Sequence, residues 1–343
     1  MFKNKTILIT GGTGSFGKAF LEHLLVNHKD LKKIIIFSRD ELKQFDLSVR
    51  FNEKKYPQIR FFLGDIRDKE RLDRAMDEVD YVVHAAALKQ VPAAEYNPFE
   101  AIKTNVIGAQ NIIEACLNSN VKKAIALSTD KACAPINLYG ATKLCSDKLF
   151  ISANNMVSKK RDLSFSVVRY GNVMGSRGSV IPEFFKQKKS GSINITDKNM
   201  TRFSITMQQS IDLVMWALKN SIGGEILVPK IPSYKILDLA KAIAPASKIN
   251  IVGLRPGEKI HEELITDNES NYSIVLKKYY VILNFLVNKP KNNLYINERK
   301  LLKNYMNLHK GKKFKKEFSY KSNTNDEFLS IEKIKKLIKK INY

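Results

Sequence analysis

The sequence predicts an α/β fold in which a doubly wound parallel sheet is joined by a smaller C-terminal α/β domain. Short apolar strands alternate with helical segments over the first 130 residues. Strands this apolar need helices on both faces, which is typical of a parallel sheet. A length of 343 residues and a hydrophobic content of 44% suit a sheet domain of roughly 200 residues plus a companion.

The elements are expected in short alternating units. The expected strands are 5–10, 33–37, 59–63, 79–84, 123–128 and 165–169, and the clearest helices are 15–27, 137–154 and 330–340. The glycine- and serine-rich stretch 171–180 is typical of a binding loop rather than a hairpin.

Two domains follow from this order of elements. We expect residues 1–170 to form the dinucleotide-binding domain, to which residues 205–232 return. Residues 171–204 and 233–343 then form the smaller, substrate-binding domain, which ends in a lysine-rich segment. The pattern weakens beyond Pro290.

The net charge of +24 raises the question of nucleic-acid binding, but its distribution argues against that function. Residues 277–343 carry 18 Lys and Arg against five Asp and Glu, and lysine dominates among them. Nucleic-acid readers more often place arginine and stacking aromatics on one organised face. We therefore expect a solvated lysine-rich surface and no nucleic-acid partner. Attraction of acidic substrates or partners remains an alternative.

The cysteines and the hydropathy pattern indicate a cytoplasmic protein. Cys116, Cys133 and Cys145 cannot all pair, which fits a reducing compartment. No apolar run approaches the ~20 residues that span a bilayer, so we expect no membrane partner. The first strand is expected within about five residues of the N-terminus, so we expect no signal peptide.

A glycine-rich turn, Thr10-Gly-Gly-Thr-Gly-Ser-Phe-Gly17, directly follows the first strand and opens the first helix. Gly11 permits a tight turn, Gly14 lets the backbone approach a pyrophosphate, and Gly17 lets helix and strand pack closely. The helix N-terminus then stabilises the phosphate charge. This context predicts a Rossmann-type dinucleotide site built from Gly11, Thr13, Gly14, Ser15, Phe16 and Gly17.

The end of the second strand indicates which dinucleotide binds. An acidic residue there would take both ribose hydroxyls and favour NAD, whereas this strand ends in Ser38 and Arg39, with Lys43 close behind. These side chains can bind a 2′-phosphate, so NADP is the expected cofactor. Asp40 would shift the preference toward NAD if its carboxylate turned to the ribose. Further expected contacts at the ends of the next two strands are Asp65, Ile66, Ala85 and Ala86.

Tyr139 and Lys143 stand four residues apart on the helix expected over 137–154, so they share one face. A phenol with a pKa near ~10 is a poor base at neutral pH. A neighbouring ammonium lowers that pKa and can also hold the nicotinamide ribose. With Thr129 upstream at a strand end, the pattern predicts an enzyme that oxidises a carbinol.

Together these motifs resemble the extended short-chain dehydrogenase/reductase superfamily, with Thr129, Tyr139 and Lys143 in the triad positions. Asp130 and Lys131 follow Thr129. Sugar epimerases of this superfamily have no ionisable pair there, and the 4,6-dehydratases that retain C5 have an Asp-Glu pair. An Asp-Lys pair resembles the inverting UDP-N-acetylglucosamine 4,6-dehydratases, the first enzymes of pseudaminic acid biosynthesis.

Similarity to that group runs along most of the chain. It is carried by residues 38–44, 84–92, 128–132, 169–173, 175–180, 200–203 and 255–259, with a fainter match at 318–320. The resemblance implies an NADP-dependent lyase with no net redox change, acting on UDP-N-acetylglucosamine. It also implies a homo-oligomer, either a dimer or a hexamer.

The resemblance also implies a mechanism. Tyr139 takes the C4 hydroxyl proton, Lys131 removes the C5 proton, and protonated Asp130 donates to the departing C6 hydroxyl. Lys131 must then be uncharged when it acts. We expect burial and the nearby Lys143 to lower its pKa, and a charged Asp130 to oppose this. In the alternative interpretation Lys131 only pairs with phosphate or with Asp130.

Further contacts are implied by the resemblance. On the cofactor side they include Lys89, Thr104 and Val173. On the substrate side they are Lys89, Asn172, Arg177, Gly178, Ser179, Val180, Thr196, Arg202, Arg255 and Glu258. The guanidinium groups of Arg202 and Arg255 are suited to pairs of diphosphate oxygens, whereas Glu258 is suited either to ribose hydroxyls or to the start of a helix. His84, inside an apolar strand, is interpreted as a core histidine. No metal site is expected.

Two departures from the family and three alternative functions remain. Ser204 stands where the family usually has tryptophan, and the C-terminal segment is unusually rich in lysine. A capsule-type UDP-sugar C5-inverting dehydratase and a UDP-sugar 4-epimerase are related alternatives, and Asp130-Lys131 argues against the epimerase. A non-catalytic NADP-binding regulator is a remote alternative, because such proteins commonly lose the tyrosine or the lysine that stand here as Tyr139 and Lys143.

Overall fold

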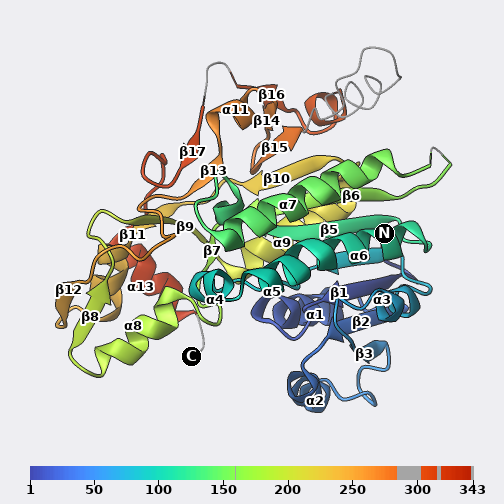
Figure 1. Ribbon diagram of the computed structural model, residues 1–343, viewed down its shortest axis with the longest axis horizontal. Helices are drawn as coiled ribbons and strands as arrows, with labels where there is room; N and C mark the ends of the chain where they lie inside the picture. Colours follow the sequence, from blue (N-terminus) through green and yellow to red (C-terminus); the bar gives the residue numbers. More distant parts are fainter. Residues whose placement is uncertain (159, 284–302, 315–317, 341–343) are drawn as a thin grey trace.

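The computed structural model describes residues 1–158, 160–283, 303–314 and 318–340. Its centre is a ten-stranded sheet in the order β16-β14-β15-β10-β6-β5-β4-β1-β2-β3 (Figure 1). The strands from β10 to β3 in this order pair in parallel, and the last three at the other edge pair antiparallel. Their bounds are β1 Thr6–Thr10, β2 Lys33–Ser38, β3 Ile59–Leu63, β4 Tyr81–His84, β5 Lys123–Thr129, β6 Ser164–Tyr170, β10 Glu225–Pro229, β14 Ser273–Val275, β15 Tyr279–Leu283 and β16 Lys312–Lys313.

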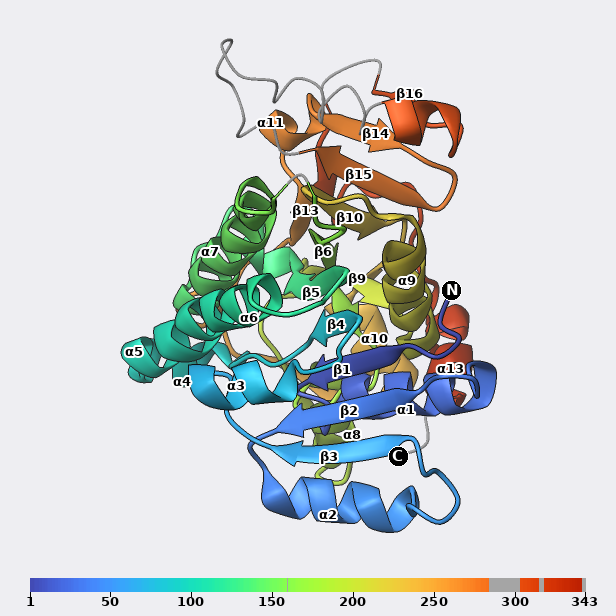
Figure 2. The same ribbon diagram turned by 90° about the vertical axis from the view of Figure 1, so that its right-hand side faces the viewer.

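Helices cover both faces of this sheet, as its apolar strands require; all five residues of β1 are buried. One face carries α3 (Lys69–Ala75), α6 (Gly108–Leu117) and α7 (Leu138–Ser152), and the other carries α1 (Ser15–Asn27) and α9 (Met207–Asn220) (Figure 2). The helix α2 (Glu41–Arg50) packs beside the edge strand β3. The short helices α4 (Val91–Tyr96), α5 (Pro98–Ile102) and α11 (Asp267–Ser270) and the π-helical turn Lys103–Ile107 complete this part.

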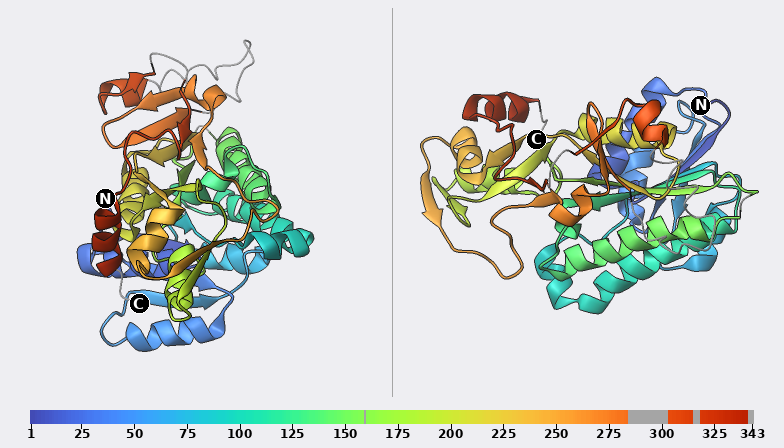
Figure 3. Two further views of the ribbon diagram at one scale, coloured as in Figure 1. Left: turned by 90° about the vertical axis from the view of Figure 1, so that its left-hand side faces the viewer. Right: turned by 90° about the horizontal axis from the view of Figure 1, so that it is seen from above.

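A smaller part lies beyond the carboxyl ends of the parallel strands and has its own core (Figure 3). Its helices are α8 (Val180–Lys188), α10 (Ile236–Ile243) and α13 (Ile331–Lys339). Its strands form the pair β8 (Ser192–Ile195) and β12 (Lys248–Ile251), and the trio β7 (Asn172–Val173), β9 (Thr201–Ile205) and β11 (Ser233–Lys235). A further pair, β13 (Glu263–Ile265) and β17 (Tyr320–Lys321), leads back toward the large sheet.

The predicted fold class is confirmed, and each strand and helix expected by residue range begins and ends within two residues of its prediction. The loop 171–180 differs in one respect, because it opens with β7, which pairs with β9. Within 233–343, β14 and β15 join the large sheet, where β15 covers the edge that β10 would otherwise expose. The division into two domains remains a prediction. Of the stretch beyond Pro290, where the pattern weakens, residues 291–302, 315–317 and 341–343 lie outside the described ranges.

Two sequence-based expectations concern the cysteines and the membrane. Cys116, Cys133 and Cys145 are all unpaired thiols, of which only the last is exposed. Within the described ranges, no helix has the length and apolar character to cross a membrane.

Candidate active site

A cleft of about 1200 Å³ opens where the parallel strands end. In a doubly wound sheet this edge is where ligands bind, because the loops that follow the strands meet there. The cleft is lined by every predicted site residue except Asp130, which is buried behind Lys131, and Arg177. Residues from both the large sheet and the smaller part contribute, so the site lies between them.

The glycine turn forms one end of the cleft. A Cβ on Gly17 would stand 2.4 Å from the carbonyl oxygen of Gly12, so only glycine lets α1 start this close to the turn. Gly11 has a φ of 63°, and a Cβ there would lie 2.8 Å from the Cα of Ala86, in the loop that follows the neighbouring strand β4. The N-terminus of α1, capped by Gly14, therefore offers its backbone N–H groups to an anion in the cleft.

The end of β2 is organised by hydrogen bonds. Ser38 Oγ lies 2.8 Å from Thr13 Oγ1, which ties the strand to the glycine turn. Asp40 caps α2 by accepting from the backbone N–H of Lys43 at 3.0 Å, and its other oxygen pairs with the Lys43 ammonium. These hydrogen bonds lower the pKa of Asp40. Its carboxylate is thus engaged by its own helix, while the half-exposed guanidinium of Arg39 lies at the cleft.

The residues predicted to contact the adenine and the middle of the dinucleotide also line the cleft. Asp65 accepts from Arg67 and lies 3.6 Å from the Arg39 guanidinium, so its carboxylate also orients that cation. Thr104, on the π-helical turn, is buried at the cleft, and its hydroxyl has no hydrogen-bond partner among the described residues. The residues expected beside them also line the cleft: Ile66, Ala85, Ala86 and Val173.

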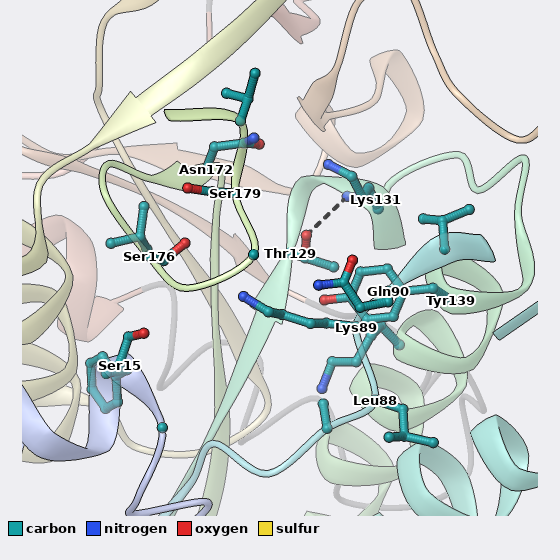
Figure 4. Close-up of a pocket in the computed structure, with 18 of the residues that line it drawn as sticks. Ser15, Leu88, Lys89, Gln90, Thr129, Lys131, Tyr139, Asn172, Ser176 and Ser179 are labelled. Carbon is teal, nitrogen blue, oxygen red and sulfur yellow. Dashed lines mark hydrogen bonds between the residues drawn. The ribbon is translucent and has the colours of Figure 1, made fainter. Parts of the chain in front are cut away.

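The catalytic candidates meet where β5 ends against α7. Thr129 is the last residue of β5, and a 3₁₀ turn over Asp130–Ala132 follows it. Tyr139 lies in the first turn of α7, which Asn137 caps by accepting from the backbone N–H of Gly140 at 2.7 Å. Thr129, Lys131 and Tyr139 gather on one wall of the cleft, with Asn172 and Ser179 opposite them (Figure 4).

Gly140 lets this helix approach the turn. An ideal Cβ at Gly140 would lie 2.2 Å from the carbonyl oxygen of Lys131 and 3.0 Å from its carbonyl carbon. The positions of Lys131 and Tyr139 relative to each other therefore depend on a glycine at this point of α7.

Burial changes the proton affinities of the tyrosine and lysine on α7. Burial raises the pKa of Tyr139 to about 12, although the charge of Lys131 and a hydrogen bond with Thr129 lower it. Burial lowers the pKa of Lys143, and Asp147 one turn further along opposes that shift. Tyr139 is accordingly a neutral phenol at neutral pH, and the expected net lowering of its pKa by the neighbouring ammonium is wrong, because burial outweighs it.

Lys131 lies between two carboxylates. Its Nζ is 3.2 Å from Asp130 Oδ1 and 3.0 Å from Glu262 Oε1. Burial lowers the pKa of Lys131, but the two carboxylates outweigh it and the pKa is raised. The expected lowering of the Lys131 pKa by burial and Lys143 is therefore wrong. Burial and the charge of Glu262 raise the pKa of Asp130, which fits the expected protonated acid.

Glu262 is a residue that the sequence-based reasoning missed. It stands three residues beyond the matched segment 255–259, is 2% exposed, and lines the cleft. An acidic pair, Glu262-Glu263, directly before an apolar strand was the available signal, because one of two such neighbours points inward in a strand.

The substrate side of the cleft is closed by the loop 171–180. Lys89 Nζ donates to the carbonyl oxygen of Arg177 at 2.8 Å, and the backbone N–H of Arg177 donates to Ser15 Oγ at 3.2 Å. The loop is thereby fastened both to the glycine turn and to the segment after β4, and Lys89 points across the cleft toward it (Figure 4). Gly178, with a φ of 73°, passes directly over Gln90.

The two arginines predicted for the diphosphate differ in their surroundings. Arg202 is buried, and its Nη atoms donate to the carbonyl oxygens of Thr201, Ile260 and Lys259. Arg255 is 66% exposed and lies 3.8 Å from Glu258. In this structure Arg255 is therefore the more available guanidinium, and a role of Arg202 in diphosphate binding remains a prediction. Thr196 and Val180 line the same end of the cleft.

His84 is a core histidine, as predicted. It is 1% exposed, its Nδ1 hydrogen-bonds Thr10 Oγ1 at 2.7 Å, and its ring stacks on Phe150. Burial lowers the pKa of His84 to about 3.

Comparison with known proteins connects this geometry to nucleotide sugars. The family described as polysaccharide biosynthesis protein matches residues 7–284. A UDP-N-acetylglucosamine 4,6-dehydratase (inverting) of Campylobacter jejuni is 52% identical over 332 residues, which cover 96% of each chain. A UDP-glucose 4-epimerase of Rickettsia bellii is 47% identical and covers 82% of this chain and 84% of its own.

Solved structures agree with the fold. The X-ray structure of Pen from Bacillus thuringiensis superposes with a TM-score of 0.85 at 39% identity, over 98% of both chains. The dTDP-glucose 4,6-dehydratase DesIV from Streptomyces venezuelae, solved with NAD and TYD bound, has a TM-score of 0.65. It is 22% identical, over 74% of this chain and 86% of its own, so this likeness concerns the fold alone.

Proposed function

The chain belongs to the polysaccharide biosynthesis protein family, and we propose that it is a UDP-N-acetylglucosamine 4,6-dehydratase that inverts the sugar at C5. The single observation that carries this proposal is the pair Asp130–Lys131, in which Lys131 lines the cleft wall beside Tyr139 and buried Asp130 lies 3.2 Å from its Nζ. A relative that shares 52% of its residues bears that activity in its name. The product is UDP-2-acetamido-2,6-dideoxy-β-L-arabino-hex-4-ulose, the first intermediate of pseudaminic acid biosynthesis, and the reaction class is that of a hydro-lyase.

The residues of the cleft fit a nicotinamide dinucleotide. The close approach at Gly11 and Gly17 leaves a cradle of backbone N–H groups for the pyrophosphate, and Lys143 is placed for the nicotinamide ribose. A nicotinamide held here would supply reversible hydride transfer between C4 and C6 of the sugar, so the reaction would have no net redox change.

The side chains supply the proton transfers. Because the phenol is neutral, Tyr139 first releases its proton to solvent, and its Oη then takes the proton of the C4 hydroxyl while Thr129 hydrogen-bonds it. The ketone that forms at C4 acidifies the C5 proton, which Lys131 Nζ removes. Asp130 donates its proton to the C6 oxygen, and water leaves. A proton from water then reaches C5 from the opposite face, so the configuration inverts, and Tyr139 keeps the proton that it took from the C4 hydroxyl.

The cofactor is proposed to be NADP. Asp40, the residue that would favour NAD, is engaged as the N-cap of α2 and by Lys43, and this engagement supports NADP over NAD. Arg39 and Ser38 remain at the cleft, where a 2′-phosphate would find a guanidinium and a hydroxyl. We further propose a cytoplasmic homo-oligomer, whose size light scattering would give.

The test is conversion of UDP-N-acetylglucosamine by the purified protein, followed by mass spectrometry of the product. The proposal predicts a product lighter by one water, formed without net consumption of NADP or NADPH. A product of unchanged mass would identify a 4-epimerase, the activity named for the Rickettsia relatives. Asp130 and Lys131 argue against that second candidate, because epimerisation at C4 needs no acid and base for C5 and C6. Turnover only with another UDP-sugar would favour the capsule-type dehydratase. An unaltered sugar with bound NADP would favour a non-catalytic regulator.

A further inference from the structure

Glu262 makes a second carboxylate contact with the proposed base. Glu262 Oε1 and Asp130 Oδ1 approach Lys131 Nζ to 3.0 and 3.2 Å, and both carboxylates are nearly inaccessible to solvent. The other oxygen of each, Glu262 Oε2 and Asp130 Oδ2, is buried and has no hydrogen-bond partner within the described ranges. The mechanism above uses only one of these two acids, and burying the second costs free energy that its ion pair with Lys131 offsets.

The protein holds Glu262 in this position. Its backbone N–H donates to Ser322 Oγ at 2.9 Å, and the backbone N–H of Ser322 donates to the carbonyl oxygen of Glu262 at 2.8 Å. Arg202 Nε lies 3.8 Å from Glu262 Oε1, and the rest of that guanidinium is fastened to backbone carbonyls. The carboxylate therefore has little freedom to leave Lys131.

The chemistry of Lys131 requires a partner of this kind. An amine removes a proton from carbon only when it is uncharged, but Lys131 between two carboxylates is held as an ammonium. A group within hydrogen-bond reach must first accept its proton, and the two acids at about 3 Å are the groups in place. Asp130 must keep its own proton for the departing C6 hydroxyl. Glu262 is the carboxylate that remains.

We propose, on the basis of the dehydratase function proposed above, that Glu262 is the proton acceptor that converts Lys131 into the base. An N–H bond of the ammonium breaks, an O–H bond forms at Glu262 Oε1, and two opposite charges become two neutral groups. The amine of Lys131 then takes the C5 proton and is an ammonium again. After water has left, Lys131 passes a proton to the charged Asp130 and recovers one from Glu262, so the cluster returns to its starting state.

The surroundings of Lys131 define what a pH profile reports. The titratable and charged groups that face it are Asp130, Glu262, Arg202, Tyr139 and Tyr234. Burial raises the pKa of Glu262, whereas Lys131 and Arg202 lower it, and the net shift is downward. The acid side of the wild-type profile should therefore report Glu262, which at low pH takes up a proton from solvent and can no longer accept one from Lys131, whereas the alkaline side reports loss of the proton that Asp130 needs.

The test compares Glu262→Gln with Glu262→Asp and with Glu263→Gln. The neighbour Glu263 is a matched control because it pairs with Lys321 outside the cleft. We expect Glu262→Gln to lower kcat about 100-fold with little change in KM, the usual contribution of a proton-transfer group. The acid side of its pH profile should move to higher pH, because solvent must then deprotonate Lys131. Glu262→Asp should recover at least a tenth of the wild-type kcat, because the carboxylate is retained.

Two further readouts separate proton transfer from a structural role. In single turnover, Glu262→Gln should still transfer the hydride from C4 of the sugar to the cofactor. The reduced cofactor should then accumulate, because only the removal of the C5 proton is slowed. By ¹⁵N NMR of labelled lysine, with Lys131 assigned from Lys131→Met, the substitution Glu262→Gln should lower the pKa of the Lys131 ammonium.

Failure of this inference is distinguishable from failure of the proposed function. Three results would overturn the proton-acceptor role and leave the dehydratase function in place. The first is a Glu262→Gln enzyme with the wild-type kcat and pH profile, and the second is one in which only KM rises. The third is a Glu262→Asp enzyme as slow as Glu262→Gln. If the wild-type protein itself does not dehydrate UDP-N-acetylglucosamine, the proposed function fails instead. In that case the NMR titration alone decides whether Glu262 controls the proton on Lys131.

Discussion

Replacing Gly140 by alanine should displace the turn over Asp130–Ala132 without replacing any reacting side chain. The new methyl would stand 2.2 Å from the carbonyl oxygen of Lys131 and 3.1 Å from Pro135. Because the first of these neighbours is backbone, the turn over Asp130–Ala132 must move away from α7 by about 1 Å to restore ordinary contact. A misplacement of ~1 Å costs roughly 100-fold in rate, or about 2.7 kcal/mol of transition-state stabilisation.

The assay is steady-state turnover of UDP-N-acetylglucosamine together with thermal unfolding. We expect kcat of Gly140→Ala to fall about 100-fold while NADP affinity is kept, because the cofactor cradle lies elsewhere. Gly191→Ala is the matched control: its Cβ meets nothing within 4 Å, but its φ is 73°. It should lose about 1 kcal/mol of stability from the left-handed backbone and keep its activity. A Gly140→Ala enzyme as fast as the wild type would refute the argument that this contact positions Lys131.

Three further results are expected. In deuterated water, Lys131→Ala should lose deuterium incorporation at C5 together with turnover, and unchanged incorporation and turnover would remove Lys131 as the base. Arg39→Ala should weaken NADP binding roughly tenfold and leave NAD binding unaltered, since only the 2′-phosphate loses a charged partner; an equal loss for both would contradict this. His84, whose pKa falls to about 3 in the fold, stabilises the protein above pH 6.5. That stability should decline by about 1.4 kcal/mol per pH unit as the pH falls from 6.5 toward 3, because the unfolded chain binds the proton first. Urea unfolding of His84→Gln should show a shallower decline over the same range, and identical slopes would exclude the histidine as the cause.

The sheet, the glycine turn and the catalytic helix could be predicted because their signals are local. The apolar run of β1, the glycines that follow it, and the four-residue spacing of Tyr139 and Lys143 each lie within one element. Most predicted cofactor contacts line the cleft for the same reason: strands that run in parallel bring their following loops to one edge.

The remaining features depend on contacts between distant segments. Glu262 contacts Lys131 from a segment far away in the sequence, so the pKa of that lysine rises where local reasoning expected it to fall. Arg202 resembled a phosphate ligand by residue type, but its donors are used by backbone carbonyls that the sequence does not identify. By contrast, the hydrogen bond that engages Asp40 is local. Its position directly before α2 would have predicted that it caps this helix.

The central claim is that Asp130 and Lys131 remove water and invert C5. The most direct measurement is the proton NMR spectrum of the product formed from UDP-N-acetylglucosamine in deuterated water. The account predicts a 4-keto-6-deoxy sugar of L-arabino configuration with deuterium at C5. A 4-keto-6-deoxy sugar that keeps the original C5 configuration, or a C4 epimer with its C6 hydroxyl intact, would contradict it.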